Sequence, residues 1–382
     1  MFPGCREVMC RVANHHLKTS LFLLLRIGLC VAALAYVISR TDIHDTVWLK
    51  DANQPVRLLS LEPQVAKIAI DGSTEMAVPV DALRAQPDGS VEVSWGLASL
   101  AQRSDLRLLL LAIAIYIVQP GLQIVRFRWM LRLQGISADW AATTAVCLVG
   151  NFYNYVIPGT TGGDVVRAGY LMRGSTNRHG AVAAIVLDRF SGMAGIFALA
   201  ALAGLVIPDD REIVRYIAAT AGAAALAMAV GFVGITGWPV VGRLLARLPL
   251  GGHLRMLYEA ASVGRRGWAW LAGAVGVTIV LQGGSMVAFS VAAVALGMEP
   301  AWSSYFVCLP ISLVVASIPI VPMGLGTMEA AMVTLLAGSV GSPSQVLGLA
   351  FTMRIIGLLW ALPGGLLSLV WMPAPAVASS ER

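Results

Sequence analysis

Ionisable side chains inside apolar segments are the residues of this 382-residue chain best suited to do chemistry. Six of them lie in or beside such segments: Asp164, Arg167, Asp188, Arg189, Glu329 and Arg354. Each costs at least about 2.5–3.5 kcal/mol to insert into a membrane, so such groups are rarely idle. For a single pair, a structural role is as well supported as a functional one: Asp188 or Glu329 can pair with Arg189 or Arg354 and hold helices together. Six groups around two interrupted segments favour a polar binding site instead.

The first interruption is the stretch NFYNYVIPGTTGGDVVR, residues 151–167, which follows an apolar run. It combines a proline, which removes a backbone donor, with glycines, which permit conformations that other residues avoid. These residues are Pro158, Gly159, Gly162 and Gly163. Asp164 and Arg167 come directly after them. Irregular backbone at membrane depth survives only where protein buries it or water lines it, so this interruption indicates the wall of a polar cavity.

The second interruption, IPIVPMGLGTME at residues 318–329, repeats the same order of residue types. Pro322 comes first, Gly324 and Gly326 follow, and the acid Glu329 ends the stretch. Interrupted segments in corresponding positions of two halves are the usual sequence sign of a transporter's binding site. Hairpin tips also expose backbone N–H groups and positive helix ends, which suit a phosphate, and an arginine adds two-pronged recognition of it. The pattern favours an anionic headgroup near the midplane, with its acyl chains left in lipid.

Composition places the chain among membrane proteins. Apolar residues make up 57% of it and charged residues 13%, and the mean hydropathy is +0.76, whereas an average soluble domain is about 25% charged. The five cysteines are isolated and offer neither zinc spacing nor a disulfide framework. The glycine-rich GTTGGD has no Lys-Ser/Thr ending and no preceding strand, which makes nucleotide binding improbable. We expect no cofactor, no metal, no nucleic-acid partner and no enzymatic activity.

Six apolar segments have spanning length, at about 20 residues per helix: residues 21–39, 106–125, 181–206, 213–236, 268–296 and 344–371. Two further stretches, 140–167 and 303–337, are predicted as re-entrant hairpins. Arginine-rich loops flank the first, so it enters from the cytoplasm, whereas the second lacks any basic residue and enters from outside. The expected fold is therefore an all-α polytopic membrane protein with six full spans and two oppositely oriented hairpins, an inverted repeat.

Arginines also orient the chain and mark its loops. The stretches 126–139 and 237–267 are rich in arginine, which predicts cytoplasmic loops and cytoplasmic N- and C-termini. Within the spans, interruptions are expected at Gln119-Pro120-Gly121 and at Gly283-Gly284. The first apolar segment is longer than the core of a signal peptide usually is, so we expect an uncleaved span.

A hydrophilic insert separates the first two spans. Residues 40–105 hold ten of the 21 acidic residues, and the pieces KIAIDG and SVEVSWG, with turn signals at Asp71-Gly72 and Asp88-Gly89, predict a small β-rich extracytoplasmic unit. A passive spacer and a binding module both fit this insert. The expected organisation is residues 1–39 as the cytoplasmic N-terminus and first helix, 40–105 as the insert, 106–372 as the transmembrane bundle and 373–382 as a disordered cytoplasmic tail.

Two signatures resemble a known family. The first consists of NYVIPGTTGGDVVRAGYLMR and the following AAIVLDRFSGMAGIFALAAL, and it resembles the lysylphosphatidylglycerol synthase transmembrane (flippase-like) family of bacteria and archaea. The second consists of IPIVPMGLGTMEAAM and the arginine of FTMRIIGLL, and it resembles the second signature of that family. The resemblance covers most of residues 15–372 apart from the insert. It implies a polytopic inner-membrane protein that moves lipids or lipid-linked groups between leaflets. The positions it carries over as substrate-binding are Asn154, Pro158, Gly162, Gly163, Asp164, Arg167, Asp188, Arg189, Gly326, Glu329 and Arg354.

Three functions follow from these observations. The first is a flippase or carrier for a phosphate-bearing lipid, either a lipid with an anionic headgroup or a polyprenyl phosphate. The second is a non-transporting membrane subunit that anchors or regulates a lipid-modifying or glycosyl-transfer enzyme. The third is a membrane transferase acting on a polyprenyl phosphate. Full-length synthases of the family carry a soluble aminoacyl-transfer domain after the membrane part, and this chain stops at Arg382, so synthesis of aminoacylated lipid is not expected.

Overall fold

The computed structural model describes most of the chain from residue 45 onward. The described residues are 45–50, 55–62, 64–70, 74–84, 91, 93–94, 96–137, 139–156, 162–174, 177–207, 211–237, 243, 258, 262–263, 267–317, 326–370 and 378–379. The predicted first span at 21–39 lies outside them, as do Pro158, Pro322, Gly324 and most of the arginine-rich stretch 237–267.

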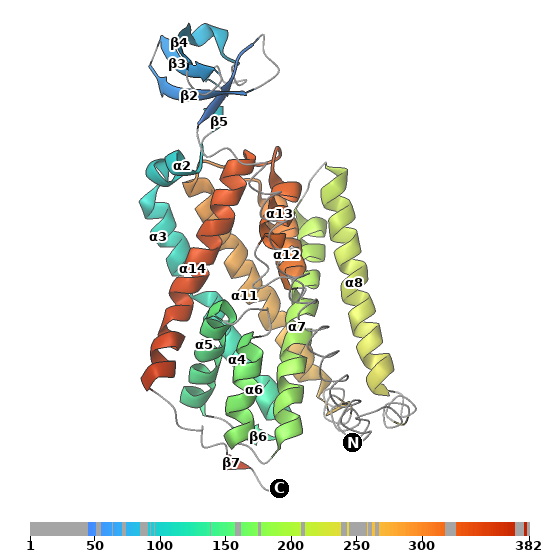
Figure 1. The fold of residues 1–382 in the computed structure, drawn as a ribbon. Helices are drawn as coiled ribbons and strands as arrows, with labels where there is room; N and C mark the ends of the chain where they lie inside the picture. The colour runs from blue at the N-terminus through green and yellow to red at the C-terminus, as the bar shows by residue number, and fades with distance from the viewer. Residues whose placement is uncertain are drawn as a thin grey trace, which may run out of the picture.

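A small antiparallel sheet precedes the helices, which confirms the predicted β-rich insert. Its strands are β1 (Thr46–Trp48), β2 (Pro55–Leu61), β3 (Val65–Ile70), β4 (Thr74–Pro79) and β5 (Val93–Ser94), in the order β4-β3-β2-β1-β5. Alternating side chains such as Ala66 and Ile68 point to one face, where they form a small core with Val47 and Leu58. In Figure 1 the sheet stands at one end of the helical bundle, beyond the short helix α2 (Leu97–Arg103).

Five described helical segments are long and apolar enough to cross a membrane: α3 (Leu106–Ile115) with α4 (Val118–Leu133), α7 (Arg178–Val206), α8 (Glu212–Gly237), α11 (Trp268–Ala295) and α14 (Pro343–Val370). They coincide with the five predicted spans that fall within the described residues. Polar caps begin several helices: Asp105 accepts hydrogen bonds from the backbone N–H groups of Arg107 and Leu108 at the start of α3, and Asn177 accepts one from Gly180 at the start of α7.

The second span differs from the prediction in where it bends and where it ends. The interruption lies at Tyr116 and Ile117, not at Gln119-Pro120-Gly121. Pro120 explains this, because it cannot donate to the carbonyl of Tyr116 and its ring excludes a straight helix there; Pro120 instead occupies the first turn of α4. The helix then continues to Leu133, so the first part of the predicted loop 126–139 is helical and Arg126 is buried within it.

Two glycines in the long helices, Gly284 and Gly364, serve close packing and do not break their helices. The predicted interruption at Gly283-Gly284 is wrong, since α11 runs unbroken from Trp268 to Ala295. A Cβ added at Gly284 would lie 3.1 Å from a methyl carbon of Val118, and one added at Gly364 would lie 1.9 Å from the carbonyl oxygen of Leu148. These glycines therefore let α11 approach α4 and let α14 approach α5 (Trp140–Val156).

Two pairs of shorter helices complete the bundle. The first pair is α5 with α6 (Gly162–Gly174), and the second is α12 (Trp302–Ser317) with α13 (Thr327–Leu336). Figure 1 shows the first pair at the end of the bundle away from the sheet and the second pair at the end near the sheet. Each pair covers only part of the length of α7, α11 and α14. Two apolar clusters match this division: one centres on Phe127, Leu171 and Leu187, and the other includes Tyr305 and Met332 among many more residues.

Only two residues of the predicted tail are described. Ala378 and Ser379 form β7, which pairs antiparallel with β6 (Ile136–Ser137) just after α4. This short pairing brings the end of the chain beside the start of the α5 and α6 pair (Figure 1).

Candidate functional site

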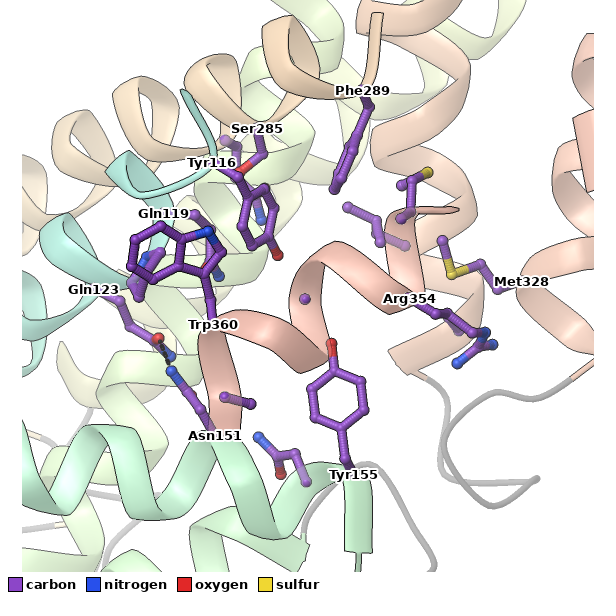
Figure 2. Close-up of a pocket in the computed structure, with 18 of the residues that line it drawn as sticks. Tyr116, Gln119, Gln123, Asn151, Tyr155, Ser285, Phe289, Met328, Arg354 and Trp360 are labelled. Atoms are coloured by element: carbon purple, nitrogen blue, oxygen red, sulfur yellow. Dashed lines mark hydrogen bonds between the residues drawn. The ribbon is translucent and has the colours of Figure 1, made fainter. Parts of the chain in front are cut away.

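A cavity of about 360 Å³ lies where the two short helix pairs approach the long helices. Side chains from α4, α5, α11 and α14 converge on it in Figure 2. Its polar lining consists mainly of carboxamides and one guanidinium group: Gln119, Gln123, Asn151, Asn154, Gln282 and Arg354. Aromatic rings, among them Tyr116, Tyr155 and Trp360, fill much of the remaining wall.

A second cavity of about 440 Å³ adjoins the first and shares three of its carboxamides, Gln119, Gln123 and Gln282. Arg126 and Arg189 line this second cavity. Among the described residues, neither lining contains an aspartate or a glutamate. The ionisable groups that face the combined space from this part of the chain are therefore arginines and tyrosines.

Glu329 and Arg354 form an ion pair beside the first cavity. Glu329 lies in the first turn of α13 and is 1% exposed; its Oε2 accepts a hydrogen bond from the backbone N–H of Gly326 at 2.8 Å. Its Oε1 lies 2.5 Å from Nε of Arg354 on α14. Gly326 has a φ of 83°, a conformation that favours glycine. These three residues, here the Glu329 cluster, tie the short helix α13 to the long helix α14.

Asp164 is held by two arginines in the half of the bundle that contains α5 and α6. It lies in the first turn of α6, where Oδ1 is 3.3 Å from Nη1 of Arg167 and Oδ2 accepts a hydrogen bond from Nε of Arg189 on α7. Arg167 is 3% exposed and donates from Nη2 to Oδ1 of Asn151 at 2.6 Å. Asn151 in turn donates to Oε1 of Gln123 at 2.9 Å. The Asp164 cluster (Asp164, Arg167 and Arg189) thus connects with the cavity lining through hydrogen bonds.

Glycines at the α5–α6 contact make room for this cluster. A Cβ at Gly163 would lie 1.9 Å from the carbonyl oxygen of Gly150, and a Cβ at Gly150 would lie 2.3 Å from Nε of Arg167. The backbone N–H of Gly163 also donates to Oδ1 of Asn154 at 2.8 Å. Any larger side chain at either glycine would separate α5 from α6 or displace the arginine.

The two clusters repeat one arrangement at one spacing. In each, an acid in the first turn of a short helix pairs with an arginine exactly 25 residues further on, in the long helix that follows: Asp164 with Arg189, and Glu329 with Arg354. The short helices lie at opposite ends of the bundle (Figure 1). An equal spacing with opposite placement is what an inverted repeat produces.

Asp188 pairs with neither of the arginines, Arg189 and Arg354, that the sequence suggested as partners. It is 3% exposed and accepts two hydrogen bonds from Arg126 on α4, at 2.8 Å and 3.0 Å, and not from Arg189 or Arg354. Arg126 also donates to Oγ1 of Thr278 on α11 at 2.9 Å. This bidentate geometry fixes α4, α7 and α11 to one another. Asp188 therefore holds the frame of the bundle and does not line either cavity.

The predicted site residues divide into three groups. Asn154 and Arg354 line the first cavity and Arg189 lines the second. The remaining described residues of the prediction lie in or beside the ion-pair clusters: Gly162, Gly163, Asp164, Arg167, Asp188, Gly326 and Glu329. Pro158 lies outside the described residues.

Of the carboxamides that line the cavities, sequence reasoning identified Asn154 and missed Gln119, Gln123, Asn151 and Gln282. Gln119 and Gln123 are four residues apart on α4, and Asn151 and Asn154 are three apart on α5. Residues at these spacings share one helix face, so polar amides at three- and four-residue spacing in apolar helices were a usable signal. Among the described residues, no group of three histidine, cysteine or acidic side chains is placed to hold a metal ion.

Comparison with known families agrees with this architecture. Residues 95–365 match the model of the lysylphosphatidylglycerol synthase TM region, so the chain belongs to that family and is a multi-pass membrane protein. The match covers the helical bundle from α2 to α14 and indicates a lipid-related function in the membrane. No soluble synthase domain is evident among the described residues. Neither a search of curated proteins nor a search of solved structures found a match.

Proposed function

We propose that this protein carries a phosphate-bearing lipid between the leaflets of the bacterial inner membrane. One observation carries the proposal: a polar cavity with Arg354 on its wall lies inside an apolar bundle, between short helix pairs placed at opposite ends. Buried polar groups within a membrane are costly and mark substrate paths. Membership in a family of lipid-associated membrane regions supports a lipid as the substrate.

The charges of the cavity suit an anionic headgroup. Arg354 lines the first cavity and Arg126 and Arg189 line the second, with no described acid in either wall. A guanidinium group binds a phosphate through two parallel hydrogen bonds. In the proposed mode the phosphate binds at Arg354, while the acyl chains stay in the surrounding lipid.

The two ion-pair clusters supply a means of alternating access. Asp164 joins α6 to α7 and Glu329 joins α13 to α14. In the proposed cycle each short pair is a re-entrant hairpin, and a phosphate that competes for the arginine releases one hairpin from its long neighbour. The cavity then opens toward that leaflet while the other cluster stays closed.

The sheet favours a second candidate function. It stands away from the bundle (Figure 1), in a position where another protein has access to it. In this alternative the chain is a non-transporting subunit that anchors a lipid-modifying enzyme. The two candidates differ in which residues matter: transport needs the cavity arginines, whereas anchoring needs the sheet.

Leaflet exchange of a fluorescent anionic phospholipid in proteoliposomes tests the carrier function. Wild-type protein should accelerate exchange over empty liposomes, and Arg354→Ala should abolish the acceleration because the phosphate loses its partner. Arg354→Lys should recover little, since an ammonium does not reproduce the two-pronged geometry. The matched control is Arg215→Ala, an exposed arginine on α8. Wild-type rates in Arg354→Ala, at equal amounts of folded protein, would contradict the proposal.

A further inference from the structure

Carboxamides dominate the polar wall of the first cavity, and three of them also line the second. We call Gln119, Gln123, Asn151, Asn154 and Gln282 the carboxamide patch. Asn151 and Asn154 are engaged by Arg167 and by the backbone of Gly163. No hydrogen bond of the Gln119 or Gln282 side chain is found among the described residues, and both side chains line the cavities. Their donors and acceptors are therefore available to a ligand.

A carboxamide matches a hydroxyl group better than a charged side chain does. It offers an acceptor oxygen and two N–H donors, whereas a carboxylate only accepts and a guanidinium only donates. A hydroxyl group both donates and accepts. Several carboxamides around one space therefore fit a ligand with several hydroxyl groups better than they fit a bare phosphate.

Aromatic rings line the first cavity together with these polar groups. The rings of Tyr116 and Phe289 are 5.3 Å apart between centroids, and Trp360 is fixed by a hydrogen bond from its indole N–H to the carbonyl of Ile113 at 2.9 Å. All three surround the cavity in Figure 2. Rings held in this way offer flat apolar surface to the C–H face of a ring-shaped polyol. A volume of about 360 Å³ lies in the range of about 300–1,000 Å³ that is usual for small-molecule sites.

The absence of acids from the described lining argues against a cationic headgroup. An ammonium group gains most from a carboxylate on the cavity wall, and none of the described residues that line either cavity is an acid. We propose that the headgroup is a polyhydroxylated ring, a hexose or inositol, esterified to the phosphate. The phosphate binds Arg354 and the ring hydroxyls bind the carboxamide patch. This inference rests on the proposed function and specifies its substrate class.

Lipid binding to purified protein in phosphatidylcholine nanodiscs tests the inference without requiring transport. The probes are phosphatidylinositol, phosphatidic acid and a lysine-esterified phosphatidylglycerol, with a hexosyl polyprenyl phosphate as a separate arm that distinguishes the two kinds of lipid anchor. Phosphatidylinositol or the hexosyl lipid should bind most tightly. Gln119→Leu and Gln282→Leu should each weaken that binding about fivefold, the effect of one hydrogen bond, and leave phosphatidic acid unaffected. Gln102→Leu, at an exposed position on α2, is the matched control.

The outcomes separate the inference from the function on which it rests. Equal affinity for phosphatidic acid and phosphatidylinositol would overturn the polyol headgroup, and so would tightest binding of the lysine-esterified lipid. Equal losses for both anionic lipids in the two glutamine variants would overturn it as well. Accelerated leaflet exchange alongside any of these results would leave the carrier function standing. Selective polyol binding without any exchange would instead contradict the carrier function and retain the site.

Discussion

Replacement of Glu329 by glutamine tests whether a lipid phosphate and this acid compete for Arg354. Glu329 is 1% exposed, and its two oxygens contact Arg354 at 2.5 Å and the backbone N–H of Gly326 at 2.8 Å. Glutamine has nearly the same shape and keeps one acceptor oxygen, so it removes the negative charge with little change in packing. Arg354 then becomes a cation on the cavity wall without its carboxylate.

The geometry sets the size of the effect. Unit charges about 4 Å apart attract by about 4 kcal/mol at an effective dielectric constant of 20, and desolvation offsets part of this attraction. The net value of a hydrogen bond to a charged group is about 1.5–3 kcal/mol. A phosphate that binds Arg354 must displace Glu329, so Glu329→Gln should tighten binding of an anionic lipid by a factor of about 10–100. Tighter binding slows release, so leaflet exchange should fall.

Equilibrium binding of a fluorescent anionic lipid to detergent-purified protein measures the first effect, and exchange in proteoliposomes measures the second. Arg354→Ala is the comparison, because it should lose both binding and exchange. The Arg354 side chain is 17% exposed, so Glu329→Gln should cost less stability than the roughly 3–5 kcal/mol for one partner of a fully buried pair. If Glu329→Gln weakens binding as much as Arg354→Ala does, the competition does not exist.

Three further predictions concern the frame and orientation of the bundle. Asp188→Asn should lower the free energy of unfolding by about 3–5 kcal/mol because Arg126 stays buried without its charge partner. In a denaturant titration, the double variant Asp188→Leu with Arg126→Met should be more stable than either single variant. If the losses of the two single variants simply add in the double variant, the two side chains do not stabilise each other as an ion pair. Gly163→Ala should cost about 1–3 kcal/mol by the same titration, since its Cβ would meet the Gly150 carbonyl; an unchanged stability would mean that α5 and α6 separate freely. If the sheet lies outside the cytoplasm, Glu75 and Ser262 lie on opposite sides of the membrane. Single cysteines placed at these positions, in a protein without its native cysteines, should then react with a membrane-impermeant maleimide from opposite sides. Labelling of both from the same side would refute that orientation.

The sequence predicted the described spans and the pairing of Glu329 with Arg354 because both depend on simple properties of the chain. Apolar runs of about 20 residues are read directly from the chain, and a buried acid needs a cation nearby, which anticipated the pairing of Glu329 with Arg354. The partner of Asp188 was missed for a geometric reason. The apolar run ends at Val125, but α4 continues to Leu133, so Arg126 belongs to the bundle and not to a loop.

The cavity lining depended on tertiary contacts that no local pattern contains. Gln119 and Gln282 are far apart in the chain and share a wall only because α4 packs against α11. Gly284 and Gly364 resemble helix breakers in the sequence, and their role in close packing becomes evident only beside Val118 and the carbonyl of Leu148. The 25-residue spacing from acid to arginine occurs twice in the sequence. It indicates a structural repeat because the acid and the arginine form an ion pair in both places.

The unequal composition of the two clusters bears on which leaflet loads the site. Among the described residues, the Asp164 cluster holds two guanidinium groups against one carboxylate, whereas the Glu329 cluster holds one against one. A surplus cation in a low dielectric raises the local concentration of anions. In the proposed carrier, this surplus changes the rate at which the site fills and the time that it stays occupied. A lipid phosphate should therefore dwell longer at the α5–α6 end and leave faster from the α12–α13 end.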